Sequence, residues 1–328
     1  MSVRISTAVK EALANKQPVI ALETAVLTSG LPQKPWSDDF GDAPEWLEKD
    51  IPINLAIAKD LTSTVIESGV VPAWVCVMNG EFVIGASLQE LEELTLNKLA
   101  SKITNANIAH AMRQGASAGT TVATTLLACK HPLLPSPIRT FATGGIGGIH
   151  TNWNIRLDIS ADLVALATTQ TCVVASGAKS ILDIPATMEA LETLGVPIVG
   201  FETKTFPRFI ESSEKKQIEI KEYHSYTELI NLCRYHWNTL NLQSAVLVAV
   251  PVQPEFALLE GTLEPLIKEA EIEWSKVSLK SPERTPFLLD YIVKATQGKS
   301  LIANLMLLKK NVKIATEIAN CLANDNTT

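Results

Sequence analysis

Short apolar runs alternate along this chain with longer stretches of helical periodicity, and that alternation constrains the fold more than any other feature. The apolar run at 18–27 is followed by a helical pattern at 53–69 and then by a second apolar run at 72–85. Further apolar runs, each typical of a strand covered on both faces, lie at 138–145, 171–177, 196–203 and 244–252. The alternation predicts an α/β fold built from βαβ units around a largely parallel sheet.

Helical patterns predict further helices at 86–100, 107–114, 160–169, 185–194, 225–238, 263–274, 286–296 and 300–324. Residues 31–52 are rich in Pro, Asp and Trp, which predicts a surface excursion. The charged segment 212–225 predicts a solvated loop or an edge strand. Neither segment has the composition of a flexible linker and no internal repeat is visible, so we expect a single domain over residues 1–328.

The composition disfavours several classes of protein. With 328 residues, 46% hydrophobic side chains and a mean hydropathy of +0.16, the chain can bury a large core without disulfides. Its net charge of -7 opposes the clustered basic surface that a nucleic-acid polymer requires. No apolar signal core begins the sequence and no run of about 18 apolar residues occurs, so we expect a cytoplasmic protein without a membrane partner. The five cysteines are scattered, without zinc-ligand spacing, and are interpreted as ordinary buried thiols.

A glycine-rich segment at 141–162 follows a predicted strand and precedes a predicted helix. Gly144, Gly145, Gly147 and Gly148 let the backbone approach a ligand closely, and amides in such turns form anion-binding concavities. A phosphate could bind there, or the glycines could serve the turn alone. The spacing GGIGG matches neither dinucleotide nor Walker patterns, so neither NAD nor ATP is implied.

Polar residues after this turn allow two interpretations. Ser160 is placed to cap the helix that follows, and Asp158 or Asp162 could assist it. The same two carboxylates also suit a hard divalent cation that keeps several of its waters. Both roles remain open from the sequence.

Three further positions are candidates for chemistry. Lys179 lies where an apolar strand meets a turn of small residues, where a partly desolvated amine would be a nucleophile, although a solvated surface lysine is the ordinary alternative. Glu23 interrupts an apolar strand and is either a general acid or base, or half of a strand-end salt bridge. Residues 120–122 enter a helix after Gly119 and could present amides to a phosphate, or simply cap that helix.

Taken in chain order, several blocks resemble the pseudouridine-5'-phosphate glycosidases, a family also called indigoidine synthase A-like. The blocks are ALETAVLTSGLP, SAGTTVATT, FATGGIGGIH, LDISADL, SGAKSILDIP, ERTPFLL and SLIANLMLL, and the likeness runs from about residue 5 to residue 322. The resemblance implies a three-layer α/β/α sandwich around a large mixed, mostly parallel sheet, commonly assembled as a homotrimer.

The resemblance also implies roles for single residues. Lys179, in GAKS, would form a Schiff base with C1 of a ring-opened ribose, and Glu23, in ALE, would be the proton donor. Asp158 matches the ligand of a divalent cation, Mn2+ or another. The positions matched to substrate binding are Lys102, Thr121, Val122, His150, Ser160, Ala161, Asp162 and Asn304.

The implied activity is reversible cleavage of the C–C glycosidic bond of pseudouridine 5'-phosphate, a small-molecule nucleotide, to uracil and ribose 5-phosphate. Protonating a glycosidic nitrogen cannot release a carbon-linked base, whereas an iminium at C1 provides an electron sink. The paired carboxylates of ordinary glycosidases would not serve this reaction. A lysine is therefore required by the chemistry.

The sequence departs from the family's usual pattern at several places. Ser29 stands where the family usually has a histidine, and residues 103–107 replace a usual Arg-Arg-Asp cluster after Lys102. Residues 250–253 differ from the usual Asn-Pro-Ile-Pro, and residues 33–50 resemble a surface insertion. These departures motivate an alternative, a relative acting on another base or sugar phosphate. A catalytically silent trimeric binding protein is a third possibility, which the intact nucleophile, acid and metal ligand oppose.

Overall fold

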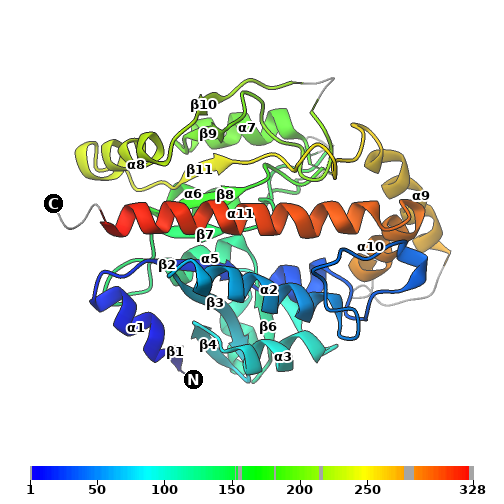
Figure 1. Cartoon of the computed structure of the whole chain (residues 1–328), viewed down its shortest axis with the longest axis horizontal. Coiled ribbons are helices and arrows are strands. Elements are labelled where there is room, and N and C mark those ends of the chain that lie inside the picture. Colours follow the sequence, from blue (N-terminus) through cyan, green and yellow to red (C-terminus); the bar gives the residue numbers. More distant parts are fainter. Residues whose placement is uncertain are drawn as a thin grey trace.

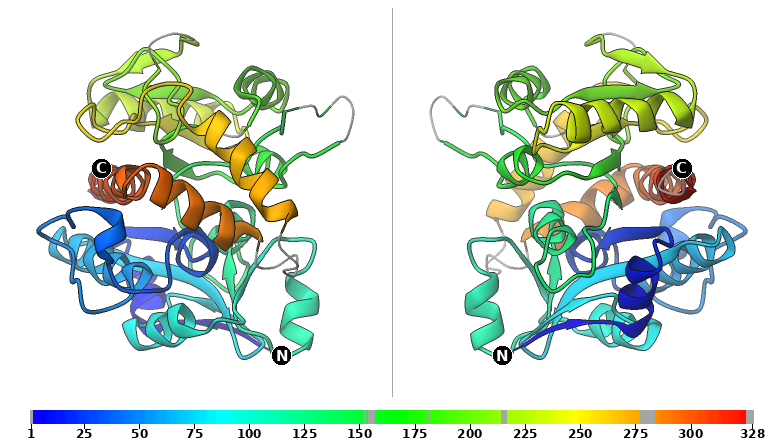
Figure 2. Two further views of the ribbon diagram at one scale, coloured as in Figure 1. Left: turned by 90° about the vertical axis from the view of Figure 1, so that its right-hand side faces the viewer. Right: turned by 90° about the vertical axis from the view of Figure 1, so that its left-hand side faces the viewer.

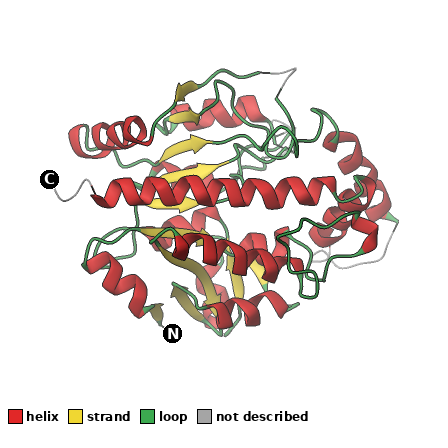
Figure 3. Cartoon of the chain, viewed as in Figure 1, coloured by secondary structure: helices red, strands yellow, loops and turns green. Residues whose placement is uncertain are grey.

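The computed structural model describes residues 2–151, 153, 157–180, 182–213, 217–276 and 284–324, with side chains from 287 onward in the last range. Within them, one mixed sheet of eleven strands runs through the molecule in the order β1-β4-β3-β2-β7-β8-β11-β9-β10, with β6 beside β3 and β5 beside β6 (Figures 1 and 3). The strands are β1 Val3–Ile5, β2 Val19–Glu23, β3 Val71–Met78, β4 Glu81–Ile84, β5 Ser101–Ile103, β6 Ala118–Thr120, β7 Thr140–Ala142, β8 Cys172–Ala175, β9 Ile198–Phe201, β10 Lys221–Tyr223 and β11 Val246–Ala249.

Helices cover both faces of this sheet, so the predicted three-layer α/β/α sandwich is confirmed (Figure 3). The helices are α1 Thr7–Ala14, α2 Ile53–Glu67, α3 Leu88–Leu96, α4 Ile108–Arg113, α5 Val122–Cys129, α6 Asp162–Ala167, α7 Ile184–Thr193, α8 Tyr226–Arg234, α9 Leu263–Ser275, α10 Arg284–Ala295 and α11 Lys299–Asn324. Helices α2, α8 and α11 pack into one apolar core, and α1, α5, α6 and α7 pack into the other. No described helix is both long and apolar enough to cross a membrane.

The central strands explain why the sequence shows unbroken apolar runs. Strands β2, β7, β8 and β11 are neighbours and pair in parallel, and β8 and β11 are buried at every residue. A strand covered by helices on both faces has no solvent side for polar residues. The only antiparallel pairs among the described strands are those that β3 makes with β4 and β6.

The long helix α11 lies across the middle of the sheet, and Figure 2 shows it nearly end-on between the N-terminal and C-terminal halves of the chain. It contacts α2 on one side, α8 on the other, and strands β2, β7 and β8 beneath it. Its buried face is apolar except at a few positions, of which Asn311 is fully buried. One helix therefore packs against both halves.

Two predicted strands differ from the structure. The run predicted over 18–27 ends as a strand at Glu23, because the Thr24 hydroxyl donates to the Val75 carbonyl at 2.6 Å and the Thr24 carbonyl accepts the amides of Leu27 and Thr28 at 3.0 Å. A short π-helix over Val26–Gly30 follows. The run at 72–85 divides into the hairpin β3–β4, whose turn places Asn79 and Gly80 at positive φ.

The two irregular segments behave much as predicted. Residues 31–52 contain no strand and one short 3-10 turn, Asp38–Phe40, although Phe40 is fully buried and anchors the segment. The charged segment 212–225 contributes β10 at the sheet edge. Four cysteines are buried, Cys321 is partly exposed, and no disulfide joins the described thiols.

Candidate active site

Two of the candidate residues, Glu23 and Lys179, lie at the carboxyl edge of the sheet. Glu23 is the last residue of β2, Thr143 follows β7 directly, and Lys179 lies four residues beyond the end of β8. These three strands are consecutive neighbours and all run parallel. In open α/β sheets this edge is where ligands bind.

Glu23 has the environment of a proton donor. The Thr143 hydroxyl donates a hydrogen bond to the Glu23 carboxylate. Burial raises the pKa of Glu23 to about 7, against the opposing effects of the Lys179 charge and the Thr143 hydrogen bond, while Asp162 raises it further. A carboxyl group with this pKa still carries its proton in a large share of molecules at neutral pH.

Lys179 is an exposed residue, so the expectation that its amine would be partly desolvated is not met. Its backbone is fixed, because its amide donates to the Ile146 carbonyl at 3.2 Å and its carbonyl accepts the Leu182 amide at 3.0 Å. The turn before it needs Gly177, whose φ is +71° and where an added Cβ would lie 2.0 Å from the Pro207 carbonyl oxygen. Two electrostatic effects place the ammonium group near the site: it acts on Glu23 and on Lys102.

Asp162 turns inward and holds backbone groups. Its carboxylate accepts the Ala123 amide at the start of α5 at 2.9 Å and the Gly147 amide of the glycine-rich turn at 2.8 Å. Ser160 accepts the Asp162 amide at 3.2 Å, and both side chains leave no room for a Cβ at Gly147. The prediction that Ser160 caps the following helix is therefore wrong: Ala161 is the N-cap residue of α6, no side chain caps that helix, and Asp162 instead accepts an amide at the start of α5.

The start of α5 and strand β5 form the neighbouring wall. The Val122 side chain is buried, so only its backbone can face a ligand, and Thr121 is the N-cap residue without a side-chain cap bond. Lys102 pairs in register with Gly119 on the adjacent β6. Burial of its ammonium group, and then the charge of Lys179, lower the pKa of Lys102, while Asp162 and Asp158 oppose that shift.

Asp158 and His150 lie on the arm beyond the glycines. Asp158 is exposed, its carbonyl accepts the His150 amide at 3.0 Å, and His150 is partly exposed. Among the described residues, no three His, Cys, Asp or Glu side chains come together as a metal cluster. Since both Asp162 oxygens accept backbone amides, Asp158 would be the one carboxylate available here to a cation, which suits an ion that keeps most of its waters.

Asn304 lies on α11, and its side-chain oxygen is buried without a hydrogen-bond partner among the described groups. A buried acceptor in that condition is unusual and points to a ligand donor or a water. The side-chain oxygen of Asn304 can therefore accept a hydrogen bond from a ligand or a water.

Sequence reasoning missed three residues of this edge. Thr143 contacts Glu23, Asn311 holds the Thr143 carbonyl, and Phe209 has a φ of 60° and packs its ring against Gly145. A polar residue directly after a buried parallel strand could have identified Thr143. An asparagine on the apolar face of a helical pattern could have identified Asn311.

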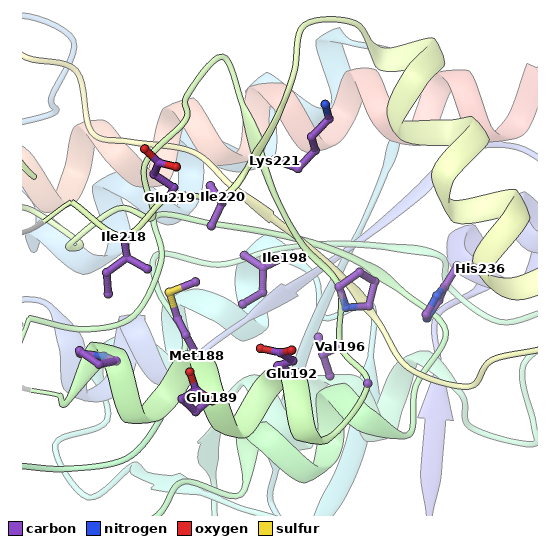
Figure 4. Close-up of a pocket in the computed structure, with 13 residues that line it drawn as sticks. Met188, Glu189, Glu192, Val196, Ile198, Ile218, Glu219, Ile220, Lys221 and His236 are labelled. Carbon is purple, nitrogen blue, oxygen red and sulfur yellow. The ribbon is translucent and has the colours of Figure 1, made fainter.

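A separate open pocket of about 760 Å3 lies beside α7, β9 and β10 (Figure 4). Its lining includes Glu189, Glu192, Glu219 and His236, and it contains none of the predicted site residues. Size alone therefore does not identify the chemistry of this molecule.

Comparisons with known proteins agree on one family. The family described as indigoidine synthase A like protein matches residues 49–321. A pseudouridine-5'-phosphate glycosidase from Saccharopolyspora erythraea is 38% identical over 97% of this chain and 97% of its own length, and one from Caldanaerobacter subterraneus is 35% identical over 96% and 95%.

Solved structures of related proteins are also similar to this chain over nearly its whole length. An indigoidine synthase A-like protein from Thermotoga maritima superposes with a TM-score of 0.78 at 30% identity, covering 98% of this chain and 96% of that one. The prealnumycin C-glycosynthase AlnA, solved in complex with ribulose 5-phosphate, superposes with a TM-score of 0.80 at 27% identity, covering 100% and 99%.

Proposed function

The chain belongs to the indigoidine synthase A-like family of enzymes, and from this membership and the site we propose that it is a glycosidase of pseudouridine 5'-phosphate. Its reaction would split the nucleotide reversibly, with water, into uracil and ribose 5-phosphate. The observation that carries the proposal is that Glu23 and Lys179 follow two strands of the same parallel sheet edge, where burial raises the pKa of Glu23 to about 7 and the Lys179 charge acts on it.

Lys179 is the proposed nucleophile. Its amine displaces the ribose ring oxygen from C1: the C–O bond of the ring breaks, and the ring oxygen takes up the proton that the amine loses. The nitrogen lone pair then forms an iminium as the bond from C1 to uracil C5 breaks. Water then attacks the iminium, which releases ribose 5-phosphate and restores the amine. The exposure of Lys179 supports this role, because a sugar phosphate can reach it.

Glu23 is the proposed proton donor to uracil C5. Uracil keeps the electron pair of the broken bond, and the new C–H bond takes its proton from the Glu23 carboxyl group. Burial, which raises the pKa of Glu23 to about 7, leaves that proton available at neutral pH. In the synthetic direction the carboxylate would take the proton back.

The remaining residues suit the two ends of the nucleotide. The positive charge of Lys102, the Thr121 hydroxyl and the Val122 backbone amide suit a phosphate, whereas the Thr121 amide already donates to the Ile103 carbonyl at 3.2 Å. The unpaired oxygen of Asn304 suits the imide N–H of uracil. We also assign substrate contacts to His150 and to the segment formed by Ser160, Ala161 and Asp162. The contacts of that segment would be made through the backbone that the Asp162 side chain holds in place.

A divalent cation, Mn2+ or another, is proposed at Asp158. The support is an exposed carboxylate beside the glycine-rich turn, with room for waters and phosphate oxygens. When bound, such an ion would neutralise part of the phosphate charge. Titration of the protein with Mn2+, followed by electron paramagnetic resonance, would show binding that Asp158→Asn weakens, and equal binding by both proteins would contradict the assignment.

A homotrimer is also proposed. Apolar side chains are exposed around Asp158, with Leu157 77% exposed, Ile159 51% and Val164 62%. Patches of this kind commonly mark contacts with another protein chain. Light scattering after gel filtration should give three times the chain mass, and a monomeric mass would contradict the assembly.

The second candidate function is a related reaction on another base or sugar phosphate. It is favoured by the structural similarity to a C-glycosynthase solved with ribulose 5-phosphate and by Ser29, which lies in the π-helix after Glu23. In both candidate reactions the lysine bonds to C1 of the sugar, and the two reactions differ in the group that leaves C1.

One experiment separates them. The purified protein is incubated with pseudouridine 5'-phosphate, with and without Mn2+, and products are identified by mass spectrometry. The main proposal predicts uracil and ribose 5-phosphate, their loss in Lys179→Ala, and their retention in the matched control Lys204→Ala, an exposed lysine elsewhere. No turnover in either direction would contradict it.

A further inference from the structure

We propose that Asn311 of α11 is a positioning residue for the reaction: it fixes the segment that carries Thr143 and so holds the Thr143 hydroxyl on Glu23. The inference deepens the proposed function and rests on it. The hydrogen bonds of Asn311 reach Thr143, Gly144 and Ser176 and not Glu23 or Lys179, so its effect would pass through the backbone after β7.

Asn311 is fully buried at the centre of the carboxyl edge. Its amide nitrogen donates to the Thr143 carbonyl at 2.8 Å and lies 3.4 Å from the Gly144 carbonyl. Toward β8, the Asn311 amide nitrogen lies 3.1 Å from the Ser176 hydroxyl, and the Asn311 amide oxygen lies 3.3 Å from it. One side chain therefore joins the ends of two adjacent parallel strands.

These hydrogen bonds hold the backbone beyond the end of β7, where strand pairing no longer does so. Strand β7 ends at Ala142, and after it the Thr143 amide still donates to the Val174 carbonyl at 3.0 Å. The Thr143 carbonyl points instead toward α11, where Asn311 is its partner. Because the backbone of Thr143 is held from both sides, its side chain has a defined direction toward Glu23.

The hydrogen bond from Thr143 matters because of what else faces Glu23. Lys179 approaches from the turn after β8, and Asp162 acts from α6. The Thr143 hydroxyl and the Lys179 charge both favour the ionised carboxylate, whereas burial and Asp162 oppose it. If Thr143 swings away, the balance moves toward the protonated form and the pKa of Glu23 rises.

A purely structural role for Asn311 makes a different prediction. Loss of a buried amide would then reduce stability and the amount of active protein, but every active molecule would keep the same pH dependence. The pH profile of kcat therefore separates positioning from stability.

The test compares Asn311→Leu, close in shape but without the amide, with the control Asn320→Leu. Asn320 lies on the same helix and donates to the Ser68 carbonyl at 3.1 Å, away from the site. We expect Asn311→Leu to lower kcat on pseudouridine 5'-phosphate by about tenfold or more, with little change in KM, and to move the basic limb of the profile to higher pH. Asn320→Leu should leave the profile in place.

Two outcomes would overturn the inference: full activity in Asn311→Leu, or a lower kcat with an unmoved basic limb. Should Asn311→Leu fail to fold, Thr143→Val tests the same link, because it removes the hydroxyl and keeps the shape, and an unmoved limb there would overturn it equally. NMR titration of the Glu23 carboxyl carbon, identified by its absence in Glu23→Gln, needs no turnover. It keeps a failure of this inference distinguishable from a failure of the proposed function.

Discussion

At the scale of single residues, Glu23 shows how position sets chemistry. The sequence places a carboxyl group at the end of an apolar run, and the structure shows that burial at this position raises its pKa to about 7. The neutral form is therefore favoured in the folded protein, while the unfolded chain ionises at the ordinary value near 4.5. Folding and titration are linked through this difference.

The linkage predicts a stability change with a definite sign. Below about pH 4.5 Glu23 is neutral in both states; as pH rises toward 7 the unfolded chain ionises first, so the folded state loses stability relative to it. Glu23→Gln cannot ionise at this position. As pH rises from 4.5 to 8, its free energy of unfolding should therefore increase by about 3 kcal/mol relative to that of the wild type.

Urea unfolding at a series of pH values measures this difference. The matched control is Glu93→Gln on α3, an exposed position. If the free energies of unfolding of Glu23→Gln and the wild type differ by the same amount at every pH in this range, Glu23 is not buried in the way described.

Sequence patterns predicted some residues of the candidate site and missed others. Lys179, Glu23 and Asp162 were identifiable because a charged group beside an apolar run or a glycine turn is costly without a purpose. Thr143 and Asn311 are uncharged; Thr143 contacts Glu23 across 120 residues of chain and Asn311 contacts Thr143 across 168, which no local pattern contains. The exposure of Lys179 agrees with the solvated alternative that the sequence left open.

At the scale of elements, α5 and α6 are joined through Asp162. Its two oxygens accept one amide at the start of α5 and one in the glycine-rich turn. A carboxylate can accept both, and a side-chain amide cannot, because one of its two polar atoms is a donor. The junction is therefore specific to aspartate.

Asp162→Asn should lower the free energy of unfolding by about 1–3 kcal/mol, because one buried backbone N–H loses its acceptor. Asp183→Asn is the control: Asp183 caps α7 through a single backbone amide, a role in which asparagine is as good. Urea unfolding of the two variants should differ clearly. Equal stability losses would contradict this account of Asp162.

Most helices and the strands within apolar runs were predictable, whereas helix α1 and the strands outside such runs were not. Every helix predicted from periodicity is present, because an amphipathic pattern over two or more turns is strong. Strands β1, β5 and β6 were not predicted, because no apolar run contains them, whereas β7, which is equally short, lies within the apolar run 138–145. The π-helix at Val26–Gly30 arises from the Thr24 side chain and carbonyl, which local apolarity does not encode.

At the scale of the whole molecule, α11 packs against both halves of the chain. Its contacts with α2 and α8 and with the central strands give the two halves a shared core element. The single domain expected from the sequence stays a prediction, and this arrangement supports it. A chain organised in this way should not unfold by halves.

We therefore expect one unfolding transition in urea. Trp74 lies in the N-terminal half and Trp237 in the C-terminal half, so two variants that each keep only one of these as the single tryptophan among the six of the chain follow each half by fluorescence. The two curves should coincide with each other and with far-ultraviolet circular dichroism at fixed protein concentration. Separate midpoints would show two independent units.

The central claim is that Lys179 bonds covalently to the sugar, and reductive trapping tests it most directly. The protein is incubated with ribose 5-phosphate and borohydride, digested, and analysed by mass spectrometry. We expect a mass gain equal to ribose 5-phosphate minus one oxygen, located on the peptide of Lys179 and absent in Lys179→Ala. An unmodified Lys179, or an adduct on other lysines that survives Lys179→Ala, would contradict it.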